Sequence, residues 1–203
     1  MNREFERQIL HICFGLLIIF LLLFEALNTR ILFFVLIFGI LLSILSLKFK
    51  IPIIYLFLER FERKEQIKKF PGKGMIFFVL GCLLALRLFG KDIALPSIMI
   101  LTLGDSISHI IGSKGKIKHF LNDYKNLEGS VLGFFASFLG VLFLIFVFNV
   151  DITILEGFFA SLIGMIAEAI DFKIGLDKVD DNIIVPLAAG TIIYLIKMGS
   201  WFF

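Results

Sequence analysis

Cysteine and charge are both scarce in this chain. Its two cysteines, Cys13 and Cys82, lie in apolar segments and fit no metal-binding or redox spacing, so each is expected to be a small buried hydrophobe. Charged residues make up 18% of the sequence, and the net charge of +3 is too small to indicate a nucleic-acid partner. The sequence therefore argues against a thiol-based site and against nucleic-acid binding.

Apolar residues are abundant instead. They account for 59% of the 203 residues, phenylalanine alone occurs 26 times, and the mean hydropathy is +1.00. A soluble domain of this length could not bury so much apolar surface, so the composition predicts an integral membrane protein. The first apolar stretch is expected to be a retained transmembrane helix, because Glu4 and Glu6 dilute the charge of Arg3 and Arg7 and no small-residue cleavage site follows it.

The hydropathy pattern predicts an all-α fold, a polytopic membrane bundle of about seven transmembrane helices in one catalytic domain, residues 1–203. Residues 51–58 are apolar but too short to cross a bilayer, and a strongly charged run follows them. They are expected to form an interfacial helix between the second and third spans. The predicted spans are residues 9–24, 31–47, 75–87, 93–111, 131–148, 152–170 and 183–197.

Lysine and arginine are distributed unevenly between the two sides of such a bundle. With seven spans, sixteen of the twenty lie on the side of the N-terminus and of the second, fourth and sixth loops. The positive-inside rule predicts that this side is cytoplasmic. The same side carries Asp105, the loop 112–130, Glu168 and Asp181, which places every candidate site residue where nucleoside triphosphates are found.

Polar residues gather at the end of the fourth span and in the loop that follows it. Charge near lipid is costly and usually marks function. Mg²⁺ prefers carboxylate oxygens together with substrate phosphates, so Asp105, Glu128 and either Glu168 or Asp181 are candidate ligands. Lysines and glycines of residues 112–116, with Lys125, have the character of a phosphate site. The segment Glu128-Gly129-Ser130 precedes the fifth span, where a helix N-terminus favours anions. The loop is not a Walker A sequence.

Simpler interpretations stand beside these. On these interpretations the lysines at 114, 116 and 118 set the topology and have no other role, and Glu128 only stabilises a helix dipole. The segment Asp180-Asp181-Asn182 can simply cap the last helix. On the simpler interpretation His109, which lies one turn from Asp105, only forms a hydrogen bond with it.

Several motifs in this order resemble the dolichol kinase and phytol kinase family of polyprenol kinases. The most specific are Gly104-Asp105-Ser106 and Lys125-x-x-Glu128-Gly129-Ser130. Weaker matches cover most of the chain: Arg7 with His11, the run 69–74, Gly112 with Gly115 and Lys116, Glu168, and Asp181-Asn182 with Pro186. The chain departs from the family at Asn126, where a serine or threonine usually follows the motif lysine.

The resemblance implies an enzyme that phosphorylates a long-chain isoprenoid alcohol in the bilayer, usually with CTP as donor and with Mg²⁺. Asp105, Glu128 and Asp181 would bind the metal, Lys125 would bind the triphosphate, and Asp105 or Glu168 would act as general base. The residues expected to hold the nucleotide are Lys73, Gly104, Ser106, Gly112, Lys114, Gly115, Lys116, Gly129, Ser130 and Asn182.

Two other functions stay open at the level of sequence. The related phosphatidate cytidylyltransferases carry a similar lysine motif, and the same residues would serve attack on the α-phosphorus of CTP. A small transporter is the other alternative, but it predicts polar residues throughout the membrane depth. The sequence determines neither the alcohol, nor CTP over ATP, nor the oligomeric state.

Overall fold

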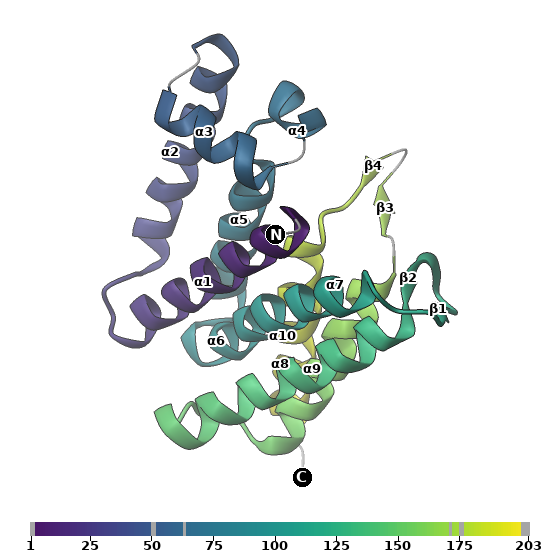
Figure 1. The fold of residues 1–203 in the computed structure, drawn as a ribbon. Coiled ribbons are helices and arrows are strands. Elements are labelled where there is room, and N and C mark those ends of the chain that lie inside the picture. Colours follow the sequence, from purple (N-terminus) through teal and green to yellow (C-terminus); the bar gives the residue numbers. More distant parts are fainter. Residues whose placement is uncertain (1–2, 50–51, 63, 171, 175–176, 200–203) are drawn as a thin grey trace.

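A computed structural model shows a bundle of helices with two short hairpins at one end (Figure 1). It describes residues 3–49, 52–62, 64–170, 172–174 and 177–199. The helices are α1 (Arg3–Leu23), α2 (Thr29–Lys48), α3 (Pro52–Phe61), α4 (Lys64–Lys69), α5 (Lys73–Phe89), α6 (Lys91–Met99), the π-helix η1 (Ile100–Asp105), α7 (Ser106–Gly112), α8 (Leu127–Phe148), α9 (Ile154–Ala169) and α10 (Asp181–Gly199). The strands are β1 (Lys118–His119), β2 (Asn122–Asn126), β3 (Lys173–Ile174) and β4 (Asp177–Lys178).

The prediction of an all-α membrane bundle is confirmed. Five helical segments of the described chain are long and apolar enough to cross a bilayer: Arg3–Leu23, Thr29–Lys48, Lys91–Gly112, Leu127–Phe148 and Asp181–Gly199. The other two predicted spans correspond to α5, with 17 residues, and α9, with 16. Helix α5 lies at the lower limit of the length that crosses a membrane, about 17 residues, and α9 is just below it.

The helical segment Lys91–Gly112 forms the centre of the bundle. It runs without interruption through α6, η1 and α7, and 78% of its most apolar stretch is buried inside the bundle. Leu101 is fully buried, and α8, α9 and α10 pack around this segment. Its middle turn is a π-helix that ends at Asp105, and such local widening of a helix is frequent at functional sites. The sequence pattern predicted a helix here but not the π-turn.

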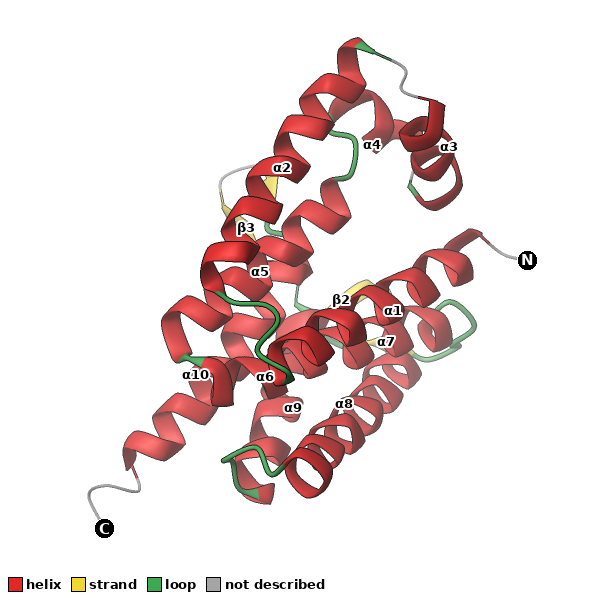
Figure 2. Cartoon of the chain, turned by 90° about the vertical axis from the view of Figure 1, so that its left-hand side faces the viewer, coloured by secondary structure: helices red, strands yellow, loops and turns green. Residues whose placement is uncertain are grey.

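The second helix lies at the periphery. It packs on α5, and only 17% of its most apolar stretch is buried. Large side chains such as Phe34 and Phe38 are more than 60% exposed. Such surface is expected where a helix faces lipid. A helix is confirmed near the predicted interfacial segment, where α3 packs against α1; Ile51, the first residue of that prediction, lies outside the described residues. Figure 2 shows α2 and α3 beside the body formed by the other helices.

The chain reverses direction between successive helices, so particular helix ends meet. The N-termini of α1, α5, α8 and α10 and the C-termini of α7 and α9 lie at the same end of the bundle (Figure 1). The antiparallel hairpins β1–β2 and β3–β4 connect α7 to α8 and α9 to α10 at this end. The sequence pattern predicts loops for both connections, and α8 begins at Leu127, four residues before the predicted span.

Candidate functional site

A cavity of about 750 Å³ opens at the end of the bundle where these helix ends meet. Residues from α1, α3, α4, α5, η1, α7, β2, α8, α9 and α10 line it. Among the described lining residues are six carboxylates, three lysines or arginines and two histidines. The cavity therefore carries more acidic than permanently basic groups: Glu4, Glu62, Asp105, Glu168, Asp180 and Asp181 against Arg7, Lys73 and Lys125.

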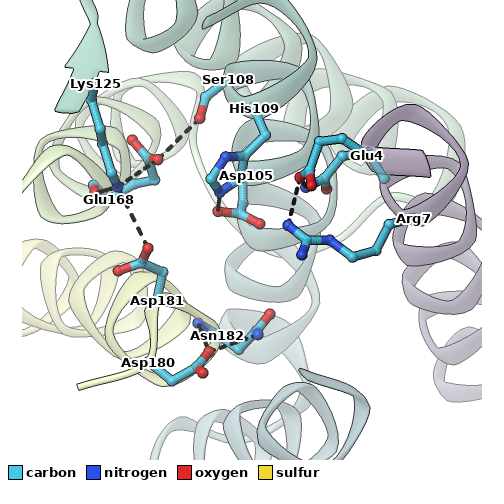
Figure 3. A network of polar contacts seen from close by, with 11 residues as sticks. Glu4, Arg7, Asp105, Ser108, His109, Lys125, Glu168, Asp180, Asp181 and Asn182 are labelled. Atoms are coloured by element: carbon cyan, nitrogen blue, oxygen red, sulfur yellow. Dashed lines mark hydrogen bonds and ion pairs between the residues drawn. The ribbon is translucent and has the colours of Figure 1, made fainter. Parts of the chain in front are cut away.

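Three acids and a histidine converge in the wall of this cavity. One ligand atom from each of Asp105, His109, Glu168 and Asp181 lies within 4.8 Å of the others. Asp105 and His109 lie one turn apart on a continuous helix, whereas the fold brings Glu168 from the end of α9 and Asp181 from the start of α10 to them (Figure 3). Asp105 is 6% exposed and Glu168 is 1% exposed. Burial of carboxylates at this depth requires compensating charge or hydrogen bonds.

Lys125 supplies part of that compensation. Its Nζ donates to Glu168 Oε1 at 2.7 Å and to the backbone carbonyl of Glu168, and it lies 3.5 Å from Asp181 Oδ2. The hydroxyl of Ser108 also donates to Glu168 Oε1, at 3.0 Å. One oxygen of Glu168 is thus fixed from two sides, as Figure 3 shows.

Other carboxylate oxygens in the cluster are less well satisfied. Within the described part of the chain, Glu168 Oε2 and Asp105 Oδ1 are buried and accept no hydrogen bond. Asp105 Oδ1 lies 3.4 Å from His109 Nε2, a contact that is ionic only when the imidazole is protonated. Buried oxygens in this condition suit a bound cation, and an oxygen-rich set favours Mg²⁺ over softer metals. The residues present therefore fit the predicted metal.

A second group of polar side chains lines the cavity beside this cluster. Lys73 Nζ lies 3.8 Å from Asp180 Oδ2, and Asn182 Nδ2 donates to Asp180 Oδ1 at 2.8 Å. On the opposite wall Arg7 is paired with Glu4. Lys73 and Arg7 line the same cavity as the acids, so a ligand there would meet both charges.

The loop before α5 closes the cavity on a further side. Its Gly72 has a positive φ of 77°, a backbone conformation that glycine adopts without strain, and its N–H donates to Glu62 Oε2 at 2.6 Å. Burial raises the pKa of the Glu62 carboxyl above its usual range, although this backbone hydrogen bond favours the charged form.

About half of the predicted site residues line the cavity. They are Lys73, Asp105, Gly112, Lys125, Ser130, Glu168, Asp181 and Asn182. The structure does not bring Gly104, Ser106, Lys114, Gly115, Lys116, Glu128 or Gly129 to it. Lys114 lines a smaller pocket of about 270 Å³ with Glu4 and Phe5.

Glu128 has a different position from the one expected of a metal ligand. Its carboxylate accepts hydrogen bonds from the backbone N–H groups of Lys116, at 2.8 Å, and Ile117, at 3.1 Å. Because α8 already begins at Leu127, Glu128 lies in its first turn and fastens the preceding loop to it. The carboxylates that do meet Asp105 are Glu168 and Asp181.

Glycines of the predicted nucleotide loop pack helices against each other. A Cβ atom on Gly129 would lie 2.5 Å from the carbonyl oxygen of Ser108 and 2.9 Å from Gly112 Cα, and one on Gly104 would lie 2.6 Å from Met165 Sδ. The sequence spacing of Gly112 and Gly129 therefore reflects the close crossing of α7 and α8.

Replacing Gly129 by alanine is expected to lower the free energy of unfolding by about 1–3 kcal/mol, because the new methyl group meets backbone atoms that cannot rotate away. Thermal unfolding in detergent measures this loss. Gly74→Ala is the matched control, since a Cβ there meets nothing within 4 Å. Equal midpoints for the two variants would contradict the close crossing.

Sequence reasoning missed some lining residues. Ser108 follows Asp105 by three positions, which puts it on the same helix face, and that spacing could have identified it. Gln8 and Asn122 carried no motif signal. Arg7 and His11 entered only through the resemblance, and both line the cavity.

Fold and site together define a multi-pass helical membrane protein with a buried acidic cluster in a cavity at one end of its bundle. The chain belongs to the family of protein MJ1137 of Methanocaldococcus jannaschii, to which it is 32% identical over 94% of its own length and 93% of that protein. No family model and no solved structure matches the chain.

Some relatives of the chain carry names that describe an activity. The chain is 29% identical to the CTP-dependent diacylglycerol kinase 1 of Schizosaccharomyces pombe over 65% of its length and 64% of that protein. It is also 29% identical to the chloroplastic phytol kinase 1 of Arabidopsis thaliana, over 61% of its length and 43% of that protein. The chain thus spans less than two thirds of both kinases. These relatives support the phytol kinase part of the resemblance, whereas its dolichol part stays a prediction.

Proposed function

We propose that this protein is a CTP-dependent lipid kinase that phosphorylates the hydroxyl group of a long-chain isoprenoid alcohol in the membrane. The observation that carries the proposal is the convergence of Asp105, Glu168 and Asp181 with Lys125 in one cavity at the end of an apolar bundle. The names of both kinases support the reaction type, and the name of the diacylglycerol kinase supports CTP as the donor.

Asp105 and Asp181 are the proposed holders of Mg²⁺. The excess of carboxylates in the cavity would repel a triphosphate, and a divalent cation would remove that repulsion. When bound, Mg²⁺ supplies charge neutralisation for the β- and γ-phosphates. In this scheme Glu168 replaces Glu128 beside the metal site, because Glu128 is engaged by backbone N–H groups.

Lys125 and Lys73 are the proposed partners of the triphosphate, with Arg7 across the cavity. In the reaction the alcohol oxygen forms a bond to the γ-phosphorus, the bond between that phosphorus and the bridging oxygen breaks, and CDP leaves. Glu168 accepts the hydroxyl proton through Oε2, the oxygen that no described residue engages, while Lys125 and Ser108 orient its other oxygen. Positioning and charge neutralisation are the main requirements of phosphoryl transfer.

The direct test uses the purified chain in detergent with Mg²⁺ and a mixture of polyprenol, phytol, diacylglycerol and phosphatidate. Parallel reactions contain CTP labelled at the α- or the γ-phosphate. We expect label from the γ-phosphate alone in the lipid product, and the product's mobility identifies the acceptor. Label from the α-phosphate would establish a cytidylyltransferase, and transfer from neither position, nor from ATP, would reject both enzymes.

The site is proposed to face the cytoplasm, on the basis of the sixteen lysines and arginines on its side of the bundle. Phe120 is 83% exposed in the turn between β1 and β2. A cysteine introduced there, in a chain with Cys13 and Cys82 replaced, should resist a membrane-impermeant thiol reagent in intact cells and react after lysis. Reaction in intact cells would reverse the proposed orientation.

A further inference from the structure

Part of the cavity wall is apolar. Helix α3 contributes Phe57, Leu58 and Phe61, and α1 contributes Leu10 and Phe14. The rings of Phe57 and Phe61 lie 4.9 Å apart, and Leu58 is only 8% exposed. A site for a nucleotide and a metal alone has no need of this wall, so it requires an explanation of its own.

Polarity changes along the face of α1 that lines the cavity. Arg7 lies near the N-terminus, His11 follows one turn later and Phe14 follows after that. At 1.5 Å per residue these positions extend over roughly 10 Å of helix. The cavity thus passes from charged groups at the end of the bundle to aromatic groups deeper in the apolar part of α1.

The apolar wall also lies next to exposed apolar side chains. On α3, Phe57 lines the cavity and is still 40% exposed, and the neighbouring Leu56 is 66% exposed. On α1, Leu17 and Phe20 are more than half exposed beyond the cavity. An alkyl chain lying between α1 and α3 would therefore continue from the cavity into the hydrocarbon of the bilayer.

We propose that the apolar part of the cavity wall, where α3 packs against α1, is the lateral entrance and binding groove for the hydrocarbon chain of a membrane-resident long-chain alcohol. The chain lies against Phe14, Leu58 and Phe61 and presents its hydroxyl to the acidic cluster. This inference rests on the proposed function for the identity of its occupant. It adds which two helices admit the acceptor and from which direction.

A photolabelling experiment tests the groove without requiring turnover. The full chain in detergent is irradiated with a long-chain alcohol that carries a diazirine near its hydroxyl end, and labelled residues are mapped by mass spectrometry. We expect label on the facing sides of α1 and α3, displaced by excess unlabelled alcohol but not by an alkane of equal length. Label confined to lipid-facing positions such as those of α2, or label that the alcohol does not displace, would overturn the proposal.

A pair of substitutions on one helix sharpens the test. Leu58→Trp fills the groove. Leu56→Trp adds the same bulk on a different face of the same helix, at an exposed position that does not line the cavity. For Leu58→Trp we expect roughly tenfold weaker displaceable labelling and a similar rise in KM for the long alcohol, with KM for CTP unchanged. A short water-soluble alcohol should keep its kcat/KM. Equal behaviour of the two variants would overturn the groove.

The two proposals fail in different ways. Displaceable labelling between α1 and α3 without any phosphoryl transfer would reject the kinase and keep the groove. Turnover that Leu58→Trp leaves intact, with labelling elsewhere, would reject the groove and keep the kinase. If Leu58→Trp does not fold, the labelling pattern of the unaltered chain still decides.

Discussion

Asp105→Asn is expected to abolish lipid phosphorylation while leaving membrane insertion and folding intact. The substitution keeps the shape of the side chain and removes the negative charge that would hold Mg²⁺ at the end of η1. Metal-based charge stabilisation contributes several kcal/mol to such reactions, so kcat should fall by about a thousandfold or more. Initial rates of label transfer from γ-labelled CTP, over a range of Mg²⁺ concentrations, measure the loss.

The control for this variant is Asp92→Asn. Asp92 lies at the other end of the same continuous helix, in the first turn of α6, is exposed and does not line the cavity. Its substitution should change neither the rate nor the Mg²⁺ dependence. Activity near that of the unaltered chain in Asp105→Asn, with no shift in Mg²⁺ dependence, would remove Asp105 from the mechanism.

The fold could be predicted from sequence where hydropathy alone determines structure. Spans such as residues 31–47 and 131–148 lie within α2 and α8 because a long apolar helix satisfies its own backbone hydrogen bonds in lipid. The π-turn before Asp105 and the hairpin β1–β2 depend instead on contacts between distant segments, which local patterns do not contain.

The site could be predicted in part for a related reason. Asp105 and Lys125 were recognisable because charge is rare in an apolar chain, and both line the cavity. Glu128 has the same chemical character, yet its carboxylate binds loop N–H groups, since the start of α8 fixes its direction. The convergence of Glu168 and Asp181 on Asp105 depends on how α9 and α10 pack, so residue type alone could not rank these acids.

Lys125→Met is expected to reduce stability as well as activity. The substitution leaves the carboxylate of Glu168, which is 1% exposed, without its cationic partner at 2.7 Å. Loss of one partner from a buried ion pair typically costs about 3–5 kcal/mol, so the thermal midpoint in detergent should fall markedly. Lys118→Met is the control, because Lys118 is exposed on β1 and does not line the cavity.

The double variant Lys125→Met/Glu168→Gln separates the two roles of this pair. Neutralising Glu168 removes the uncompensated charge, so most of the lost stability should return, because a buried ion pair can often be replaced by neutral groups at little cost. Phosphoryl transfer should stay lost, since both the triphosphate partner and the proton acceptor are gone. A double variant as unstable as Lys125→Met would mean that Lys125 stabilises the fold through its contacts with Asp181 and the backbone, not through the charge of Glu168. Recovered activity in the double variant would instead exclude both residues from catalysis.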